Sequence, residues 1–174
     1  PENIIKRLSG GAVYDSSCSP EARVYYIDKD GGYFLKLSAA GTLGREAELT
    51  EYFHGIGRGA AVLDYRTGER DLLLTARVVG EDATDARYLS DPERLATLMG
   101  RELRALHSVD PSGCPVTDRM GEYLALAERN FNTGCYDASH FPDSFGYASA
   151  DEAYRVLREG GYLLKNEVLI HGDF

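Results

Sequence analysis

The chain has 174 residues, and its 19 Lys plus Arg against 28 Asp plus Glu give a formal net charge of −9. Hydrophobic residues make up 43% and charged residues 27%, which supplies a core and excludes a wholly disordered chain. The acidic balance argues against a nucleic-acid partner, because such a surface needs Lys and Arg to neutralise phosphates. No run of aliphatic residues is longer than four, so no membrane span or membrane partner is expected.

The first half of the chain predicts two β-hairpins with a helix between them. Residues 23–37 are rich in β-formers around Asp30-Gly31-Gly32, which supplies the positive φ angles of a tight turn. Residues 61–75 form the second predicted hairpin. Apolar side chains recur at helical spacing over residues 42–55. The predicted stripe consists of Leu49, Tyr52, Phe53 and Ile56.

Helical periodicity dominates beyond this region. One helix is expected to end near Ser108, and its start has two interpretations. Ser90 can form a capping box with Glu93, or Asp91 can cap a helix whose first residue is Pro92. The apolar face of this helix comprises Leu95, Leu98, Met99, Leu103 and Leu106.

Two further helices are expected near residues 118–131 and 150–159, followed by a short buried strand over 167–170. Strands with one helix, then mainly helices, predict an α+β fold. We expect a small antiparallel-sheet lobe with one helix over residues 1–78. The start of a mainly helical lobe would cover residues 79–174.

The three cysteines are Cys18, Cys114 and Cys135. Their odd number, wide spacing and lack of a C-x-x-C pair favour free thiols over disulfides or structural zinc. The sequence also lacks a basic start followed by an apolar segment, so no secretory signal is expected. Together these features predict a cytoplasmic protein.

The return strand of the first hairpin carries the first candidate functional residues. Side chains alternate along a strand, so Phe34 and Lys36 share one face. A nucleotide needs such a pair: a flat apolar ring against its base and a cation near its phosphates. The alternative interpretation is a core phenylalanine beside a surface lysine.

Glu46 lies on the apolar stripe of the first helix, with Leu49 and Phe53 three and seven residues further on. A carboxylate facing a core is costly unless it is paired, and Lys36 is its natural partner. Such a pair would hold the ammonium in position for phosphate oxygens. The alternative is that Glu46 only interacts favourably with the helix dipole.

Two short segments complete the set of candidates. The loop over residues 16–20 lacks a Gly-x-Gly-x-x-Gly motif but offers serine hydroxyls and backbone N–H groups, which can bind phosphate. His171-Gly172-Asp173 follows the last apolar run, where a carboxylate can act as a base or orient a hydroxyl nucleophile. Either segment alone is also typical of an ordinary turn.

Taken together and in order, these segments resemble the aminoglycoside phosphotransferase family, which has a protein-kinase-like fold. The similarity is greatest to the 3′-phosphotransferases of kanamycin- and neomycin-like compounds. The segments that carry the resemblance are Ser19-Pro20, residues 33–37, 44–46, 72–77, 106–110 and 114–115, and His171-Gly172-Asp173. Each motif is loose, but six in this order are fairly specific.

The resemblance implies a nucleotide site with assigned roles. Lys36 would contact the α- and β-phosphates and pair with Glu46. Ser19 and the backbone at Cys18 would cover the phosphates, and Phe34 would stack on the adenine.

Further roles follow from the same resemblance. The backbone of Thr75 and Arg77 would bind the purine edge, and Asp173 would be the catalytic residue that orients or deprotonates the substrate hydroxyl. Asp137 and Asp143 would bind substrate ammonium groups, although solvated loop acids are the commoner case.

The implied activity is transfer of a phosphate from ATP or GTP, with Mg²⁺, to an aminoglycoside hydroxyl. The family pattern continues after H-G-D with an Asn and a metal-binding Asp. These residues would lie downstream of Phe174, so no metal ligand is expected within this chain and the 174 residues alone are expected to be inactive. The alternatives are a kinase of choline, homoserine, a fructosamine or a macrolide, and a non-catalytic nucleotide-binding remnant.

Overall fold

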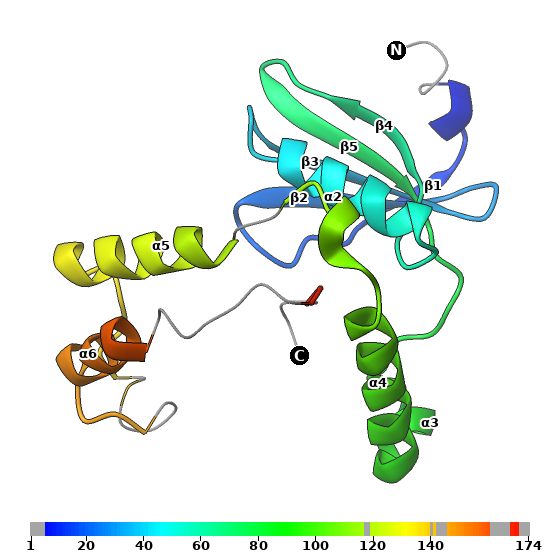
Figure 1. The fold of residues 1–174 in the computed structure, drawn as a ribbon. Helices are drawn as coiled ribbons and strands as arrows, with labels where there is room; N and C mark the ends of the chain where they lie inside the picture. The colour runs from blue at the N-terminus through cyan, green and yellow to red at the C-terminus, as the bar shows by residue number, and fades with distance from the viewer. Residues whose placement is uncertain (1–5, 117–118, 140, 142–145, 161–167, 171–174) are drawn as a thin grey trace. The chain divides into compact units, whose positions relative to one another are not determined.

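The computed structural model describes residues 6–116, 119–139, 141, 146–160 and 168–170 (Figure 1). The chain divides into two compact units, Pro1–Asp91 and Pro92–Phe174. Within the described residues, no helix has both the length and the apolar character needed to cross a bilayer.

The first unit is built on a five-stranded antiparallel sheet with the order β1-β2-β3-β5-β4. Its strands are β1 Ala12–Asp15, β2 Ala22–Asp28, β3 Tyr33–Ala39, β4 Val62–Arg66 and β5 Arg70–Ala76. Both predicted hairpins are confirmed, and β3 pairs with β5 to join them. Asp30, Gly31 and Gly32 have φ angles of 48°, 95° and 99°, as the tight turn between β2 and β3 requires.

Helix α2, Gly44–Gly55, packs against this sheet (Figure 1). Its buried contact is made by Ala47 and the preceding Leu43 with Leu73 of β5, and half-buried Val62 and Tyr65 of β4 pack against them. The four residues of the predicted apolar stripe are only half-buried. The expected docking face was therefore wrong in detail: the small Ala47 side chain at the first turn lets the helix approach the sheet closely.

Asp71 is a fully buried acid on the core side of β5. Its Oδ1 accepts the Gly41 N–H at 2.9 Å, and its Oδ2 accepts the Leu43 N–H at 2.8 Å and the Tyr65 hydroxyl at 3.2 Å. The two backbone hydrogen bonds are the main cause that lowers the pKa of Asp71 from 3.8 to about 2. The charge is thus satisfied within the protein, as a buried carboxylate requires.

Two further predictions can be compared with the structure, the start of α4 and the last strand. Helix α4 spans Pro92–His107, which favours Pro92 as its first residue. Ser90 instead follows a short helix, α3 Ala86–Leu89, which was not predicted and whose N-cap Asp85 accepts the Arg87 N–H. The strand expected over residues 167–170 is wrong for the described residues 168–170, which adopt no strand, and Glu167 lies outside the described residues.

The second unit also contains α5 Arg119–Thr133 and α6 Ala150–Gly160, both as predicted, and the short 3₁₀ helix Pro111–Gly113. Helices α5 and α6 pack through the stacked rings of Phe131 and Tyr154, whose centroids are 4.2 Å apart.

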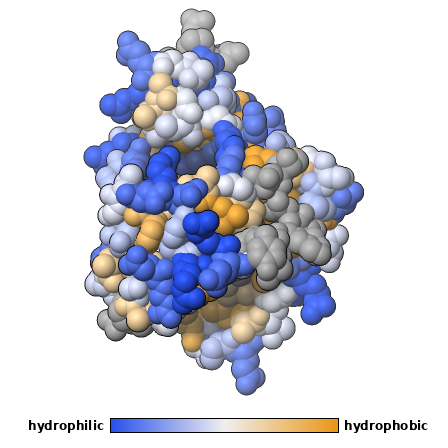
Figure 2. All heavy atoms as spheres, turned by 60° about the vertical axis from the view of Figure 1, so that its left-hand side comes forward, coloured by the Kyte–Doolittle hydropathy of each residue, from blue (hydrophilic) through white to orange (hydrophobic). Residues whose placement is uncertain are grey.

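On the face seen in Figure 2, apolar side chains form small patches among hydrophilic ones, in keeping with the net charge of −9.

The buried contact below α2 leads to a stability prediction. Leu73→Ala should lower the free energy of unfolding by about 2–5 kcal/mol, because it removes buried methyl groups and leaves a cavity. Urea denaturation followed by circular dichroism measures this change. Val79→Ala is the control, since Val79 is 90% exposed, and an equal loss in both variants would contradict the assigned core.

Asp71 leads to a prediction about pH. Because its folded pKa is about 2 and the unfolded value is near 3.9, its charge stabilises the fold above about pH 4. That contribution is lost as the pH falls toward 2. The stability difference between the wild type and Asp71→Asn, measured by urea denaturation, should therefore shrink from pH 5 to pH 2. A difference that stays constant over this range would contradict the low pKa.

Candidate functional site

An ion pair joins the third strand to the helix that follows it. Lys36 Nζ of β3 lies 2.9 Å from Oε1 and 2.7 Å from Oε2 of Glu46 in the first turn of α2. The side chains of Lys36 and Glu46 are 31% and 42% exposed. The predicted pair is confirmed, and the alternative in which Glu46 serves only the helix dipole is not supported.

The value of this pair lies in position more than in stability. Partly exposed ion pairs contribute at most about 1 kcal/mol to folding. An ammonium group has three N–H donors, and two of them suffice for the two Glu46 oxygens. The third donor, held at a defined place on β3, can bind an anionic oxygen.

Aromatic rings lie on the same side of the sheet as Lys36. Directly opposite residues of antiparallel strands share a face, and Tyr14, Tyr26 and Phe34 are opposite one another across β1, β2 and β3. The Phe34 and Tyr26 centroids are 5.3 Å apart, and those of Tyr26 and Tyr14 are 6.1 Å apart. Phe34 is two residues from Lys36, so this aromatic row ends beside the cation.

Sequence reasoning identified Phe34 but missed Tyr14 and Tyr26. The sequence contained the information needed to place Tyr26, because a hairpin turn at residues 30–32 puts Tyr26 opposite Phe34. Tyr14 could not be assigned in the same way, since the length of the β1–β2 loop does not fix its register.

The end of β5 is held close to the β2–β3 turn. The Arg77 N–H donates to the Gly32 carbonyl at 3.0 Å, and the Arg77 guanidinium carbon lies 6.0 Å from the centre of the Tyr26 ring. A Cβ on Gly32 would come within 2.9 Å of both side chains. A purine edge that binds the Arg77 N–H would therefore compete with the hydrogen bond from this N–H to the Gly32 carbonyl. Thr75, the other residue expected at the purine edge, lies within β5 opposite Phe34.

The β1–β2 loop is anchored at one residue. Ser17 Oγ accepts the Val24 N–H at 3.0 Å, and the Ser17 N–H donates to Asp15 Oδ1 at 2.9 Å. Hydrogen bonds that Asp15 accepts from the Ser17 side chain and from the Ser17 backbone lower the pKa of Asp15. Cys18 and Ser19 follow the anchor and are exposed, so solvent reaches the two loop residues expected to cover phosphates.

Of the expected substrate and catalytic acids, Asp137 lies among the described residues. Asp137 accepts the N–H and hydroxyl of Ser139 at 2.9 Å and 2.6 Å in a local turn. Asp143 and Asp173 lie outside the described residues. Their roles, like those of Asp137, stay predictions.

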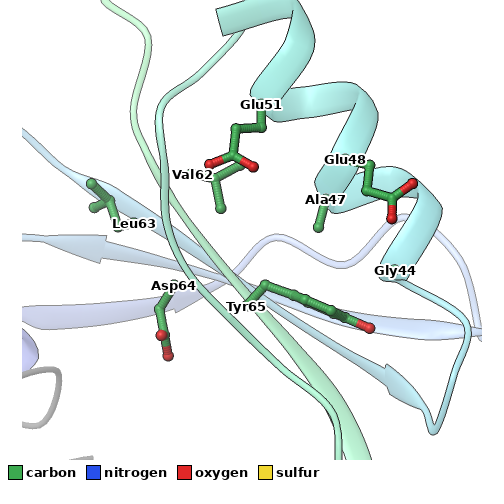
Figure 3. Close-up of a pocket in the computed structure, with 8 residues that line it drawn as sticks. All are labelled: Gly44, Ala47, Glu48, Glu51, Val62, Leu63, Asp64 and Tyr65. Carbon is green, nitrogen blue, oxygen red and sulfur yellow. The ribbon is translucent and has the colours of Figure 1, made fainter. Parts of the chain in front are cut away.

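A separate open hollow of about 280 Å³ lies between α2 and β4 (Figure 3). Glu48 and Glu51 of α2 and Asp64 of β4 make its lining acidic, and Tyr65 lies between the helix and the strand. None of the residues expected to bind nucleotide lines it. The acidic surface here suits no phosphate, which distinguishes it from the region around Lys36.

Asp71 was also missed, although it is the most buried acid among the described residues. The signal was an acid immediately before the run Leu72–Leu74 and on the same strand face as Leu73. Its partners could not be named from the sequence, because Gly41 and Leu43 come from a different connection of the chain.

This geometry can now be compared with known proteins. The model of the phosphotransferase enzyme family matches residues 20–174. A probable aminoglycoside 3′-phosphotransferase of Lactococcus lactis subsp. lactis (strain IL1403) is 35% identical over 175 residues, which cover 100% of this chain and 66% of that protein. An aminoglycoside 3′-phosphotransferase of Escherichia coli is 28% identical over 111 residues, 63% of this chain and 41% of that protein.

Solved structures share the fold. The crystal structure of an aminoglycoside-3′-phosphotransferase of type VIII matches 99% of this chain and 66% of its own, with a TM-score of 0.72 and 21% identity. An aminoglycoside phosphotransferase from Streptomyces rimosus in complex with ADP and streptomycin matches 93% and 61%, with a TM-score of 0.67 and 21% identity. The α+β fold with a kinase-like sheet lobe is thereby confirmed.

The chain spans 66% or less of the length of these relatives. The family match nevertheless covers all of it beyond residue 19, including the Lys36–Glu46 pair. This chain belongs to the phosphotransferase enzyme family.

Proposed function

We propose that this protein transfers the γ-phosphate of ATP or GTP to the 3′-hydroxyl of an aminoglycoside, and so confers antibiotic resistance. The observation that carries the proposal is the Lys36 ammonium, held by both Glu46 oxygens at 2.7 and 2.9 Å. The identity of 35% to a probable aminoglycoside 3′-phosphotransferase supports the substrate and the position of transfer.

The nucleotide would lie along the sheet face that carries Lys36. The free N–H donor of Lys36 binds α- and β-phosphate oxygens, and Glu46 keeps the ammonium from rotating away. The edge of the purine ring meets the backbone near Thr75 and Arg77. Its face packs on Phe34, whose ring lies 5.3 Å from that of Tyr26 on the adjacent strand. Ser19 and the Cys18 backbone close over the phosphates from the β1–β2 loop.

The proposed transfer is a single displacement. The substrate hydroxyl oxygen forms a bond to the γ-phosphorus as the bond to the β–γ bridging oxygen breaks, and the nucleoside diphosphate leaves. The hydroxyl proton passes to a base, for which Asp173 is the proposed residue. Asp137 and Asp143 are proposed to bind ammonium groups of the aminoglycoside.

Among the described residues, no group of three or more His, Cys, Asp or Glu side chains could hold a metal ion such as Mg²⁺. No step is therefore assigned to a metal held by these residues. We propose that the family residues expected beyond Phe174 supply the Mg²⁺ ligands, and that the 174 residues alone do not catalyse transfer. Assays of this chain and of a longer protein, each with and without EDTA, test both points.

The cytoplasm is the proposed location. It contains the nucleoside triphosphate donor, and it suits the three free cysteines, Cys18, Cys114 and Cys135, because thiols stay reduced there.

Removal of the Lys36 ammonium is the first test. In a protein that extends beyond Phe174, Lys36→Ala should lower kcat/KM for ATP with kanamycin by about a hundredfold or more, because a preorganised donor to the phosphates is lost. The free energy of unfolding should change by less than about 1 kcal/mol, since the pair is partly exposed. Coupled detection of nucleoside diphosphate measures the rate.

Lys6→Ala is the matched control, since Lys6 is an exposed lysine of the same unit and should keep wild-type activity. Normal turnover by Lys36→Ala would contradict the proposed role of the pair.

The substrate assignment needs its own test. Kanamycin should be phosphorylated, and an aminoglycoside that lacks the 3′-hydroxyl should not, because the proposed nucleophile is missing. Mass spectrometry of the products, with choline and homoserine as competing substrates, measures this preference. Phosphorylation of choline or homoserine in place of kanamycin would replace the aminoglycoside assignment.

A further inference from the structure

We propose that Asp71 is a positioning residue for the Lys36–Glu46 pair. The buried Asp71 carboxylate accepts the backbone N–H of Leu43, a group that Glu46 is also placed to bind. The Glu46 carboxylate is therefore available to bind Lys36. The functional consequence rests on the proposed nucleotide site, whereas the structural effect on Lys36 can be measured without any nucleotide.

The position of Glu46 in α2 is the first step of the argument. Leu43 is the N-cap of α2, and no side chain caps this helix locally. Glu46 is therefore the third helical residue. In a capping box, a Glu at this position reaches back to the N-cap N–H. Glu46 does not do so, since both its oxygens are bonded to Lys36.

The N–H of the N-cap residue Leu43 is instead bonded by a residue of strand β5. Asp71 Oδ2 accepts the Leu43 N–H at 2.8 Å, and Oδ1 accepts the Gly41 N–H at 2.9 Å. Leu43 has no side-chain acceptor and is buried, so it cannot cap the helix itself. The Asp71 carboxylate thus performs the capping role that Glu46 would otherwise fill, and its negative charge also suits the start of a helix.

The register of the sheet connects this anchor to the lysine. Lys36 is opposite Leu73, and Ser38 is opposite Asp71, on the adjacent strands β3 and β5. Lys36 and Asp71 therefore lie on the same face of the sheet. Fixing Leu43 to Asp71 also fixes Glu46, one helical turn further on, above the face that carries Lys36.

Tyr65 completes the anchor. Its hydroxyl donates to Asp71 Oδ2 at 3.2 Å, and a Cβ on Gly44 would come within 3.2 Å of that hydroxyl. The absence of a side chain at Gly44, the first residue of α2, lets the tyrosine reach the carboxylate. Asp71 is therefore held on both oxygens by groups that leave it little freedom to move.

The first experiment observes the Lys36 ammonium directly, by ¹⁵N NMR of lysine-labelled protein without nucleotide. The resonance is assigned by its loss in Lys36→Arg, and its position without a carboxylate partner is given by Glu46→Gln. Asp71→Asn should move the resonance to the Glu46→Gln position or broaden it beyond detection. Asp64→Asn, an acid of β4 outside the pair, should leave it unchanged. An unchanged resonance in folded Asp71→Asn would overturn the proposal.

The second experiment separates positioning from a general loss of stability. In a protein that extends beyond Phe174, Asp71→Asn and Glu46→Gln should each raise the Kd for ATP by about ten- to a hundredfold, as for a misplaced binding group. The double variant should match Glu46→Gln alone, because Asp71 acts through Glu46. Multiplied effects in the double variant would overturn the proposal. No ATP binding by the wild type would refute the proposed function, and the NMR result would still decide the role of Asp71.

A third measurement does not depend on the folding of Asp71→Asn. Hydrogen exchange of the Leu43 amide should be equally slow in the wild type and in Glu46→Gln, because Asp71 is its acceptor. Faster exchange by tenfold or more in Glu46→Gln would show that Glu46 is the capping group, and would overturn the proposal.

Discussion

The docking of the first turn of α2 on strands β4 and β5 is the constraint on which the candidate site depends. An ion pair as exposed as Lys36–Glu46 cannot hold a helix in place, because water competes for both charges. The contact of Ala47 with Leu73 is buried, and so is the Asp71 carboxylate that accepts the Leu43 N–H. The pair exists because these buried contacts bring its two side chains together.

The same sheet face combines two kinds of interaction that a nucleotide requires. Tyr14, Tyr26 and Phe34 form a row of rings across three strands, and Lys36 follows Phe34 at the next position on that face. The acidic hollow beside Glu48, Glu51 and Asp64 lies elsewhere on α2. Around α2, the acids of the hollow lie on one side and the lysine-bound carboxylate of Glu46 lies on another, so a phosphate suits the side that carries Lys36.

Much of the local structure could be predicted, because it depends on neighbours in the chain. The Asp30-Gly31-Gly32 turn predicted the first hairpin, and the alternation of side chains along a strand placed Phe34 and Lys36 on one face. Pro92 was one of the two predicted starts of α4, and the helix begins there. The errors arose where packing between elements determines which face is buried. The stripe of Leu49 and Phe53 has the right period for a buried face, but the sheet contacts α2 at Ala47. Period alone does not say how close two elements approach.

The sequence by itself determined the α+β order of elements, the family resemblance and the identity of the lysine and glutamate, because these follow from residue type and short-range spacing. Only the tertiary structure decided how the hairpins join through β3 and β5, and which groups surround Asp71. The two backbone partners of Asp71, Gly41 and Leu43, come from the β3–α2 connection, about thirty residues earlier in the chain. Their meeting follows from strand pairing between distant segments, and no local pattern encodes that pairing.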